Sequence, residues 1–187
     1  MKTRILFIAL LLTSILSAKA AKPVAISAGN ASALKNCGEV VCVFDYSNTT
    51  VEGKTLMAYL EGRGEDFVRD WPIDTEDLDN NFMALFNAKN KLGIQMVSKS
   101  ETAKYKFVLS FSQLDFGNGI SSMVPFGGAK AGGFIIWGRA DFIDISTGET
   151  VLSFTIDELK GTGATTERVR RTLTYMELKN NLLKLMK

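Results

Sequence analysis

The chain has 187 residues, a formal net charge of +2 and no histidine. This length suits one domain of ordinary size. Without histidine the chain cannot form a Ser-His or Cys-His catalytic pair or a histidine-bearing zinc site, so we expect no catalytic residues and no enzyme activity.

Residues 1–20 have the three parts of a secretory signal peptide: Lys2 and Arg4, the apolar run 5–12, and the cleavage site Ala18-Lys19-Ala20. Cleavage would remove three basic residues, leaving 19 basic and 20 acidic residues and a net charge of −1. Binding to nucleic acid is not expected without a basic excess. We expect a periplasmic or secreted protein with no transmembrane span after signal cleavage.

Residues 21–36 show no hydrophobic periodicity and are predicted to be a flexible lead-in, followed by a single domain over 37–187. The apolar run 40–46 predicts a strand covered on both faces. Cys37 and Cys42 flank its start. In an extended chain their Cα atoms would lie roughly 16 Å apart, so a disulfide needs a turn at Gly38, and the alternative is a buried free Cys42.

Residues 54–71 combine helical spacing with glycines at 62 and 64, which indicates either two helical turns or a long excursion. A helix capped by Asp74 or Thr75 is predicted next, ending at Gly93. Its apolar stripe consists of Leu78, Phe82, Leu85 and Phe86. The acidic residues at 76, 77 and 79 would then lie in the first turn, where the helix dipole favours them.

Alternating or short apolar runs predict four more strands, at 94–97, 105–111, 134–145 and 151–157. Residues 144–149 form the turn of a hairpin between the last two. Matching the apolar faces places Phe142 opposite Phe154 and Ala140 opposite Ile156.

Residues 165–186 are predicted to be a terminal helix with Thr165 as its N-cap. Its apolar stripe consists of Val169, Leu173, Met176, Leu178, Leu182 and Leu185. The basic residues on its remaining surface are Arg168, Arg170, Arg171, Lys179 and Lys184. The element order predicts an α+β fold: a two-layer sandwich with a mixed, mostly antiparallel sheet of about four to five strands and helices on one face.

Two glycine-rich stretches are similar to nucleotide-binding loops. In 161–166, Thr166 stands where a dinucleotide fingerprint needs glycine, so we interpret the stretch as a crossover that glycine permits. In 127–133, Gly133 and Phe134 stand where a phosphate loop needs Lys and Ser or Thr. The acidic run 77–81 lacks the glycine and glutamate of a calcium loop. We therefore expect no cofactor and no metal.

The loop 117–133 is long for a connection between two strands, and loops longer than roughly 12–15 residues are usually functional or disordered. It is apolar, whereas a disordered loop should be polar. Its candidate contact residues are Ile120, Met123, Val124, Phe126 and Lys130, the last being its only charge. It is either an interaction flap or a cover for the protein's own sheet. The flap would dock on an envelope protein partner, on another copy of the chain, or peripherally on a membrane.

Trp137, Arg139 and Asp141 share one face of a predicted strand. They form either one wall of a ligand pocket between the loop and the sheet, or an exposed pair of opposite charges beside a tryptophan.

Three further features carry a resemblance to a known family: Ala103 and Tyr105 at the start of a strand, the Gly-Ala-Gly-rich loop 127–133, and the Asp-x-x-Thr-Gly-Glu turn at 144–149. With these features the chain resembles exported bacterial envelope domains of unknown function. Their fold is similar to the TolB amino-terminal domain and the curli secretion-channel lipoprotein core. The chain lacks the lipidated cysteine of the channel protein. The resemblance implies a non-enzymatic accessory domain that acts through protein–protein contacts; the alternative is a small-ligand-binding domain or an unrecognised hydrolase.

Overall fold

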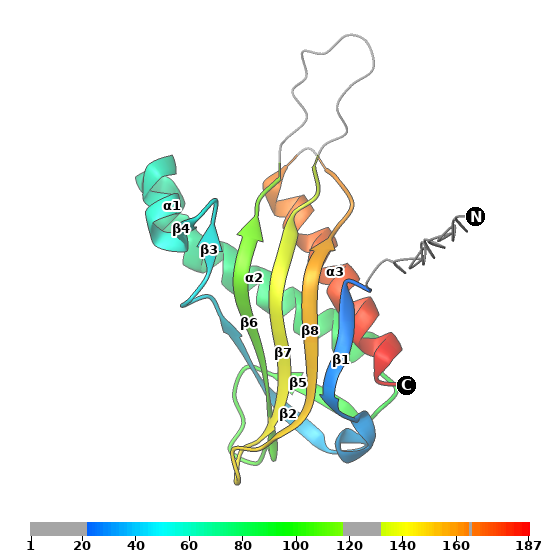
Figure 1. Cartoon of the computed structure of the whole chain (residues 1–187). Helices are drawn as coiled ribbons and strands as arrows, with labels where there is room; N and C mark the ends of the chain where they lie inside the picture. Colours follow the sequence, from blue (N-terminus) through cyan, green and yellow to red (C-terminus); the bar gives the residue numbers. More distant parts are fainter. Residues whose placement is uncertain (1–21, 118–131, 165) are drawn as a thin grey trace, which may run out of the picture.

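The computed structural model describes residues 22–117, 132–164 and 166–187 (Figure 1). The strands are β1 (Val24–Gly29), β2 (Gly38–Asp45), β3 (Thr50–Val51), β4 (Lys54–Thr55), β5 (Ile94–Val97), β6 (Tyr105–Asp115), β7 (Ile135–Asp144) and β8 (Thr150–Lys160). The helices are the 3-10 helix η1 (Ala31–Leu34) and α1 (Leu56–Arg63), α2 (Glu65–Lys89) and α3 (Glu167–Leu185). None of the helices in these ranges is long and apolar enough to cross a membrane.

The strands form one mixed sheet with the order β1-β8-β7-β6-β2-β5, and the short β3 and β4 lie beside β6. The pairs β1–β8, β8–β7 and β7–β6 are antiparallel, whereas β2 is parallel to both β6 and β5. Figure 1 shows α2 and α3 behind the sheet, on one of its faces. Phe107, Phe142 and Phe154 point from the strands into this layer and are fully buried. The mixed sheet and the helix-covered face agree with the predicted α+β class.

The sheet has eight strands in the described residues, so the expected four to five is wrong. The strands that were not predicted are β1, β3 and β4. The last two have only two residues each, too few to show a periodicity. Strand β1 lies in the segment 21–36, which is therefore not a flexible lead-in. Hydrogen bonding along β8 holds this segment as a strand and buries Val24 opposite Ile156.

The hairpin of β7 and β8 is confirmed, but its pairing differs from the prediction by two residues. Phe142 lies opposite Leu152, and Ala140 lies opposite Phe154. The turn is closed by the Asp144 amide, which donates to the Glu149 carbonyl at 2.9 Å, and a bulge follows at Phe142/Ile143. Because the displacement is even, the same side chains still face the core.

Helix α2 begins at Glu65, nine residues before Asp74 and ten before Thr75, the two predicted caps. Gly64, with a φ of 127°, separates it from α1, and the helix then runs from Glu65 through Pro72. Thr75 does not cap it: its hydroxyl donates to the Trp71 carbonyl at 2.9 Å, inside the helix. Local signals misplaced this start because a proline normally interrupts a helix, and the packing of α2 against the sheet overrides Pro72, whereas Gly64 does act as a breaker.

Helix α3 is capped by Thr166, whose hydroxyl accepts a hydrogen bond from the Val169 amide, whereas the predicted cap Thr165 lies outside the described residues. Leu178 and Leu182 are buried as predicted, but Val169 is 46% exposed. The buried residues in the first half of the helix are Arg170, Arg171, Thr174 and Tyr175, and Lys179 is buried further along. The assignment of Arg170, Arg171 and Lys179 to the solvent side is therefore wrong.

The stretch 161–164 connects β8 to α3, as predicted for a crossover. The Thr174 hydroxyl donates to the Phe134 carbonyl at 2.6 Å and accepts from the Gly161 amide at 3.1 Å. A Cβ atom at Gly161 would come within 2.5 Å of the Thr174 backbone nitrogen. Glycine is needed here because α3 passes directly over the chain.

We expect Gly161→Ala to lower the free energy of unfolding by about 1–3 kcal/mol, because the added methyl group forces α3 away from the crossover. Gly62→Ala is the control: it lies in α1 with open space around it, and alanine there should be neutral or stabilising by about 0.5–1 kcal/mol. Urea unfolding measures both. Equal effects of the two substitutions would contradict the close approach.

Candidate functional site

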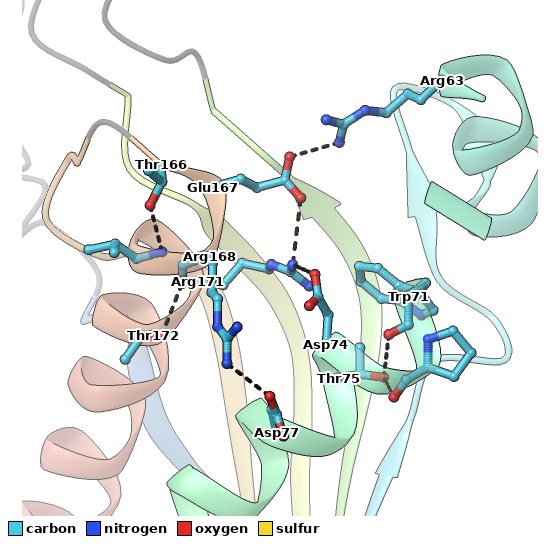
Figure 2. Close-up of polar contacts among 12 residues, drawn as sticks. Arg63, Trp71, Asp74, Thr75, Asp77, Thr166, Glu167, Arg168, Arg171 and Thr172 are labelled. Atoms are coloured by element: carbon cyan, nitrogen blue, oxygen red, sulfur yellow. Dashed lines mark hydrogen bonds and ion pairs between the residues drawn. The ribbon is translucent and has the colours of Figure 1, made fainter. Parts of the chain in front are cut away.

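A cleft of about 400 Å³ lies where α1 and α2 meet α3. Figure 2 shows the side chains that cross it. Arg63 of α1 pairs with Glu167 of α3 at 2.8 Å, and Arg171 of α3 pairs with Asp74 of α2 at 2.7 Å. Each of these charges has a partner on another helix. The cleft is thus built as a set of ionic contacts that hold α3 against α1 and α2.

Arg171 is the buried member of this set, with 4% of its surface exposed. One nitrogen, Nη2, bonds to Asp74, and the same atom lies 3.8 Å from Glu167. Its Nε and Nη1 atoms have no hydrogen-bond partner in the described residues, and the guanidinium lies 5.2 Å from the centre of the Trp71 ring. Burying a charge with two unpaired donors is costly, so the Asp74 carboxylate must offset most of that cost.

A second pocket, of about 500 Å³, lies between the distal half of β2 and α2; we call it the β2–α2 pocket. Strand β2 contributes Cys42, Phe44 and the following Tyr46, which alternate along the strand and therefore face the same side. Helix α2 contributes Pro72, Thr75, Glu76, Asp79, Asn80 and Met83. The pocket thus has an apolar wall on the sheet and a largely polar one on the helix.

Asp79 is the more buried of the two carboxylates that line this pocket, since Glu76 is exposed. Its Oδ1 atom accepts a hydrogen bond of 3.1 Å from the Tyr46 hydroxyl, which lies 2.6 Å from the Tyr175 hydroxyl. Burial raises the pKa of Asp79 to about 7, an effect that the Tyr46 hydrogen bond partly offsets. No lysine or arginine of the described residues forms an ion pair with Asp79. The carboxylate therefore lacks the cationic partner that Asp74 has.

The cysteines are both free, which agrees with the alternative of a buried free Cys42 and not with a disulfide. Burial raises the pKa of Cys42 to about 12, so its sulfur stays a thiol at neutral pH. Burial also raises the pKa of Cys37. A thiol in this state is a poor nucleophile, so Cys42 serves the β2–α2 pocket as an apolar wall.

The predicted interaction residues Ile120, Met123, Val124, Phe126 and Lys130 lie outside the described residues. The predicted ligand face is described: Trp137, Arg139 and Asp141 lie on β7, on the sheet face away from the helices. Arg139 Nε donates to Asp141 at 2.7 Å and lies 3.1 Å from the Ser153 hydroxyl of β8. The two residues thus form an ion pair in which the Arg139 side chain is 55% exposed and the Asp141 side chain 16% exposed, and the ligand role stays a prediction.

Sequence reasoning missed both Arg171 and Asp79 as site residues. Once α2 is known to begin at Glu65, Asp79 lies in its interior and not in a first turn. Buried residues of α2 at 75, 82, 83 and 86 then show helical spacing with 79, which would have marked Asp79 as facing the sheet. For Arg171 the only sequence signal is its place beside Thr174 and Tyr175, which is too weak to distinguish a buried arginine from an exposed one.

No family model and no curated protein matches the chain. Among solved structures, the PelC dodecamer from Paraburkholderia phytofirmans is 14% identical and aligns over 83% of this chain and 96% of the PelC chain, with a TM-score of 0.47. A leucine-to-methionine variant of that dodecamer gives 14% identity, coverage of 83% and 94%, and a TM-score of 0.41. Likenesses of this degree assign no function. The resemblance to TolB and the curli channel protein stays a prediction.

We expect Asp74→Ala to destabilise the protein by about 2 kcal/mol, because it leaves the Arg171 charge buried without its closest partner. The effect falls below that of a fully buried pair because the Asp74 side chain is 37% exposed. Arg171→Met removes the charge itself and should cost about 1 kcal/mol or less. Chemical unfolding compares the two variants. A larger loss from Arg171→Met would contradict this account. Asp70→Ala, an exposed acid beside Arg69, is the control and should have almost no effect.

We expect stability to fall as the pH rises from 5 to 8. The folded-state pKa of Asp79, about 7, is above its value in the unfolded chain, so the folded protein holds a proton in this range that the unfolded chain releases. The loss should be about 2 kcal/mol, and it should be complete above pH 7. The chain has no histidine, whose titration in the same pH range would obscure this loss of stability.

The Asp79→Asn variant tests this assignment, since it should remove most of the pH dependence and unfold at a higher urea concentration than the wild type at pH 8. Asp77→Asn, on the exposed side of α2, should leave the pH dependence unchanged. An undiminished slope in Asp79→Asn would show that another group is responsible.

Proposed function

We propose that this protein is a non-enzymatic binding domain that accepts an extended segment of a protein partner as an added strand on the outer edge of β2. The supporting observation is the unequal length of the neighbouring strands. Strand β5 pairs with β2 only as far as Val97 opposite Val41, whereas β2 continues to Asp45 and pairs there with β6 alone. In the described part of the chain, no strand lies on the outer side of residues 42–45.

The β2–α2 pocket lies under this unpaired edge. Its lining includes Cys42 and Phe44 of β2 and also Ser98, the first residue after β5. A strand that continued the line of β5 would therefore lie over the pocket. Its main chain would hydrogen-bond to β2, and alternate side chains would point into the pocket, as in other complexes formed by strand addition.

The chemistry around the pocket favours binding over catalysis. Cys42 is held as a thiol by burial, and the Thr75 hydroxyl of the lining donates to the Trp71 carbonyl instead of to Asp79. The chain also lacks histidine, the commonest general base. With residues 1–20 as a signal peptide, the partner would be a protein of the cell envelope or the exterior.

Amide hydrogen exchange tests strand addition directly. The probes are short blocked peptides of alternating valine and threonine with a central lysine, glutamate or norleucine. We expect at least one of them to slow the exchange of the outward-facing amides among residues 42–45, because these amides gain a hydrogen-bond partner. Amides of β1, at the opposite end of the sheet, serve as the internal control and should not change.

A pair of variants tests whether the peptide binds at the edge of β2 and not at the edge of β1. Val43 and Ile26 are 42% and 41% exposed and lie on β2 and on β1 respectively. Val43→Lys should weaken binding of the norleucine peptide severalfold, because a lysine on an edge strand opposes further pairing. Ile26→Lys should bind as the wild type does. The proposal fails if no peptide protects residues 42–45 at millimolar concentration, or if protection falls on β1 instead.

A further inference from the structure

We infer that the β2–α2 pocket selects a basic side chain, lysine or arginine, on the added strand, and that the Asp79 carboxylate accepts it. The inference rests on the strand addition proposed above and names the residue class that such a partner must present.

The first argument is the unmatched charge. Asp74, Asp77 and Glu167 each have an arginine nitrogen within 2.8 Å. Asp79 is partly buried, yet among the described residues its one polar partner is the neutral Tyr46 hydroxyl, which bonds to Oδ1. A carboxylate that is partly desolvated and accepts one neutral hydrogen bond is best stabilised by an added cation.

The second argument is the fixed position of this carboxylate. The Tyr46 ring stacks on Phe111 at 4.7 Å between centroids and meets Trp71 edge-on at 5.7 Å, so its hydroxyl cannot swing away. Burial raises the pKa of Tyr46 and of Tyr175 well above the ordinary value, which keeps both hydroxyls protonated. With Tyr46 donating to Asp79, Tyr175 donates to Tyr46. The acceptor is therefore oriented before any ligand arrives.

The third argument is the character of the residues that line the pocket and its opening. The side chains of Phe44, Pro72 and Met83 line the pocket and suit the aliphatic stem of a lysine or arginine. Glu76 also lines the pocket and is exposed, so it adds a second negative charge near the opening. An anionic side chain would meet two carboxylates here and is excluded.

The pairing also fixes where the basic residue must stand. Residues directly opposite each other in a sheet point to the same face. Partner residues opposite Cys42 and Phe44 therefore face α2 and the pocket, whereas the residue opposite Val43 faces away. The motif is thus a basic residue within an alternating strand, set opposite Cys42 or Phe44.

The test measures peptide affinity for the wild type, Asp79→Asn and Glu76→Gln. We expect the wild type to bind the lysine peptide about tenfold tighter than the norleucine peptide, the usual scale of a charge-assisted hydrogen bond. Asp79→Asn should reduce this preference to about twofold or less and leave norleucine binding and the protection of residues 42–45 intact. Glu76→Gln, the matched control, should keep most of the preference.

The outcomes separate this inference from the proposed function. Equal affinity of the wild type for the lysine and norleucine peptides, with residues 42–45 still protected, overturns the basic-residue inference and leaves strand addition standing. Absence of protection with every peptide overturns strand addition. In that case n-butylamine, which carries the ammonium group without a strand, still tests whether Asp79 accepts a cation. A shift of the Asp79 carboxyl-carbon resonance on adding the amine supports the basic-residue inference. No shift overturns that inference.

Discussion

The arrangement of the two layers depends on Tyr175 of α3. Its ring stacks on Phe44 of β2 and Phe111 of β6 and meets Phe82 of α2 edge-on, and its hydroxyl lies 2.6 Å from that of Tyr46. One side chain thus joins the terminal helix to the long helix and to two central strands. Because aromatic pairs have preferred geometries, these contacts fix the angle at which α3 crosses the sheet as well as its distance.

Trp71 links the ionic cleft to the β2–α2 pocket. Its ring centre lies 5.2 Å from the Arg171 guanidinium of the cleft, and its ring meets that of Tyr46, a pocket residue, edge-on. In the cleft the opposite charges come from different helices and satisfy each other. In the pocket the negative charge of Asp79 meets only a hydroxyl. The first arrangement suits holding helices together, and the second leaves an interaction for a partner to make.

The sequence predicts those parts of the fold that local patterning controls. The alternating runs that became β6, β7 and β8 and the buried pair Leu178 and Leu182 were found from periodicity alone. Strand β1 was missed because it is held in place by pairing with β8, which lies far along the chain. Arg170 and Arg171 were misplaced because a buried arginine depends on partners that periodicity does not reveal. The candidate site was missed for a related reason: the position of Asp79 becomes clear only when the start of α2 is known, and a helix that starts there runs through Pro72, a residue that normally breaks helices.

The pairing of the first strand with the last also bears on how the chain folds. The hydroxyl of Ser27 bonds to that of Ser153, 126 positions further on. Closing so long a loop costs entropy before any contact repays it, and such long-range pairings slow folding. We therefore expect strand β1 to dock late, after β7 and β8 have formed their hairpin. In that order of events the outer edge of β8 would stay unpaired until β1 arrives.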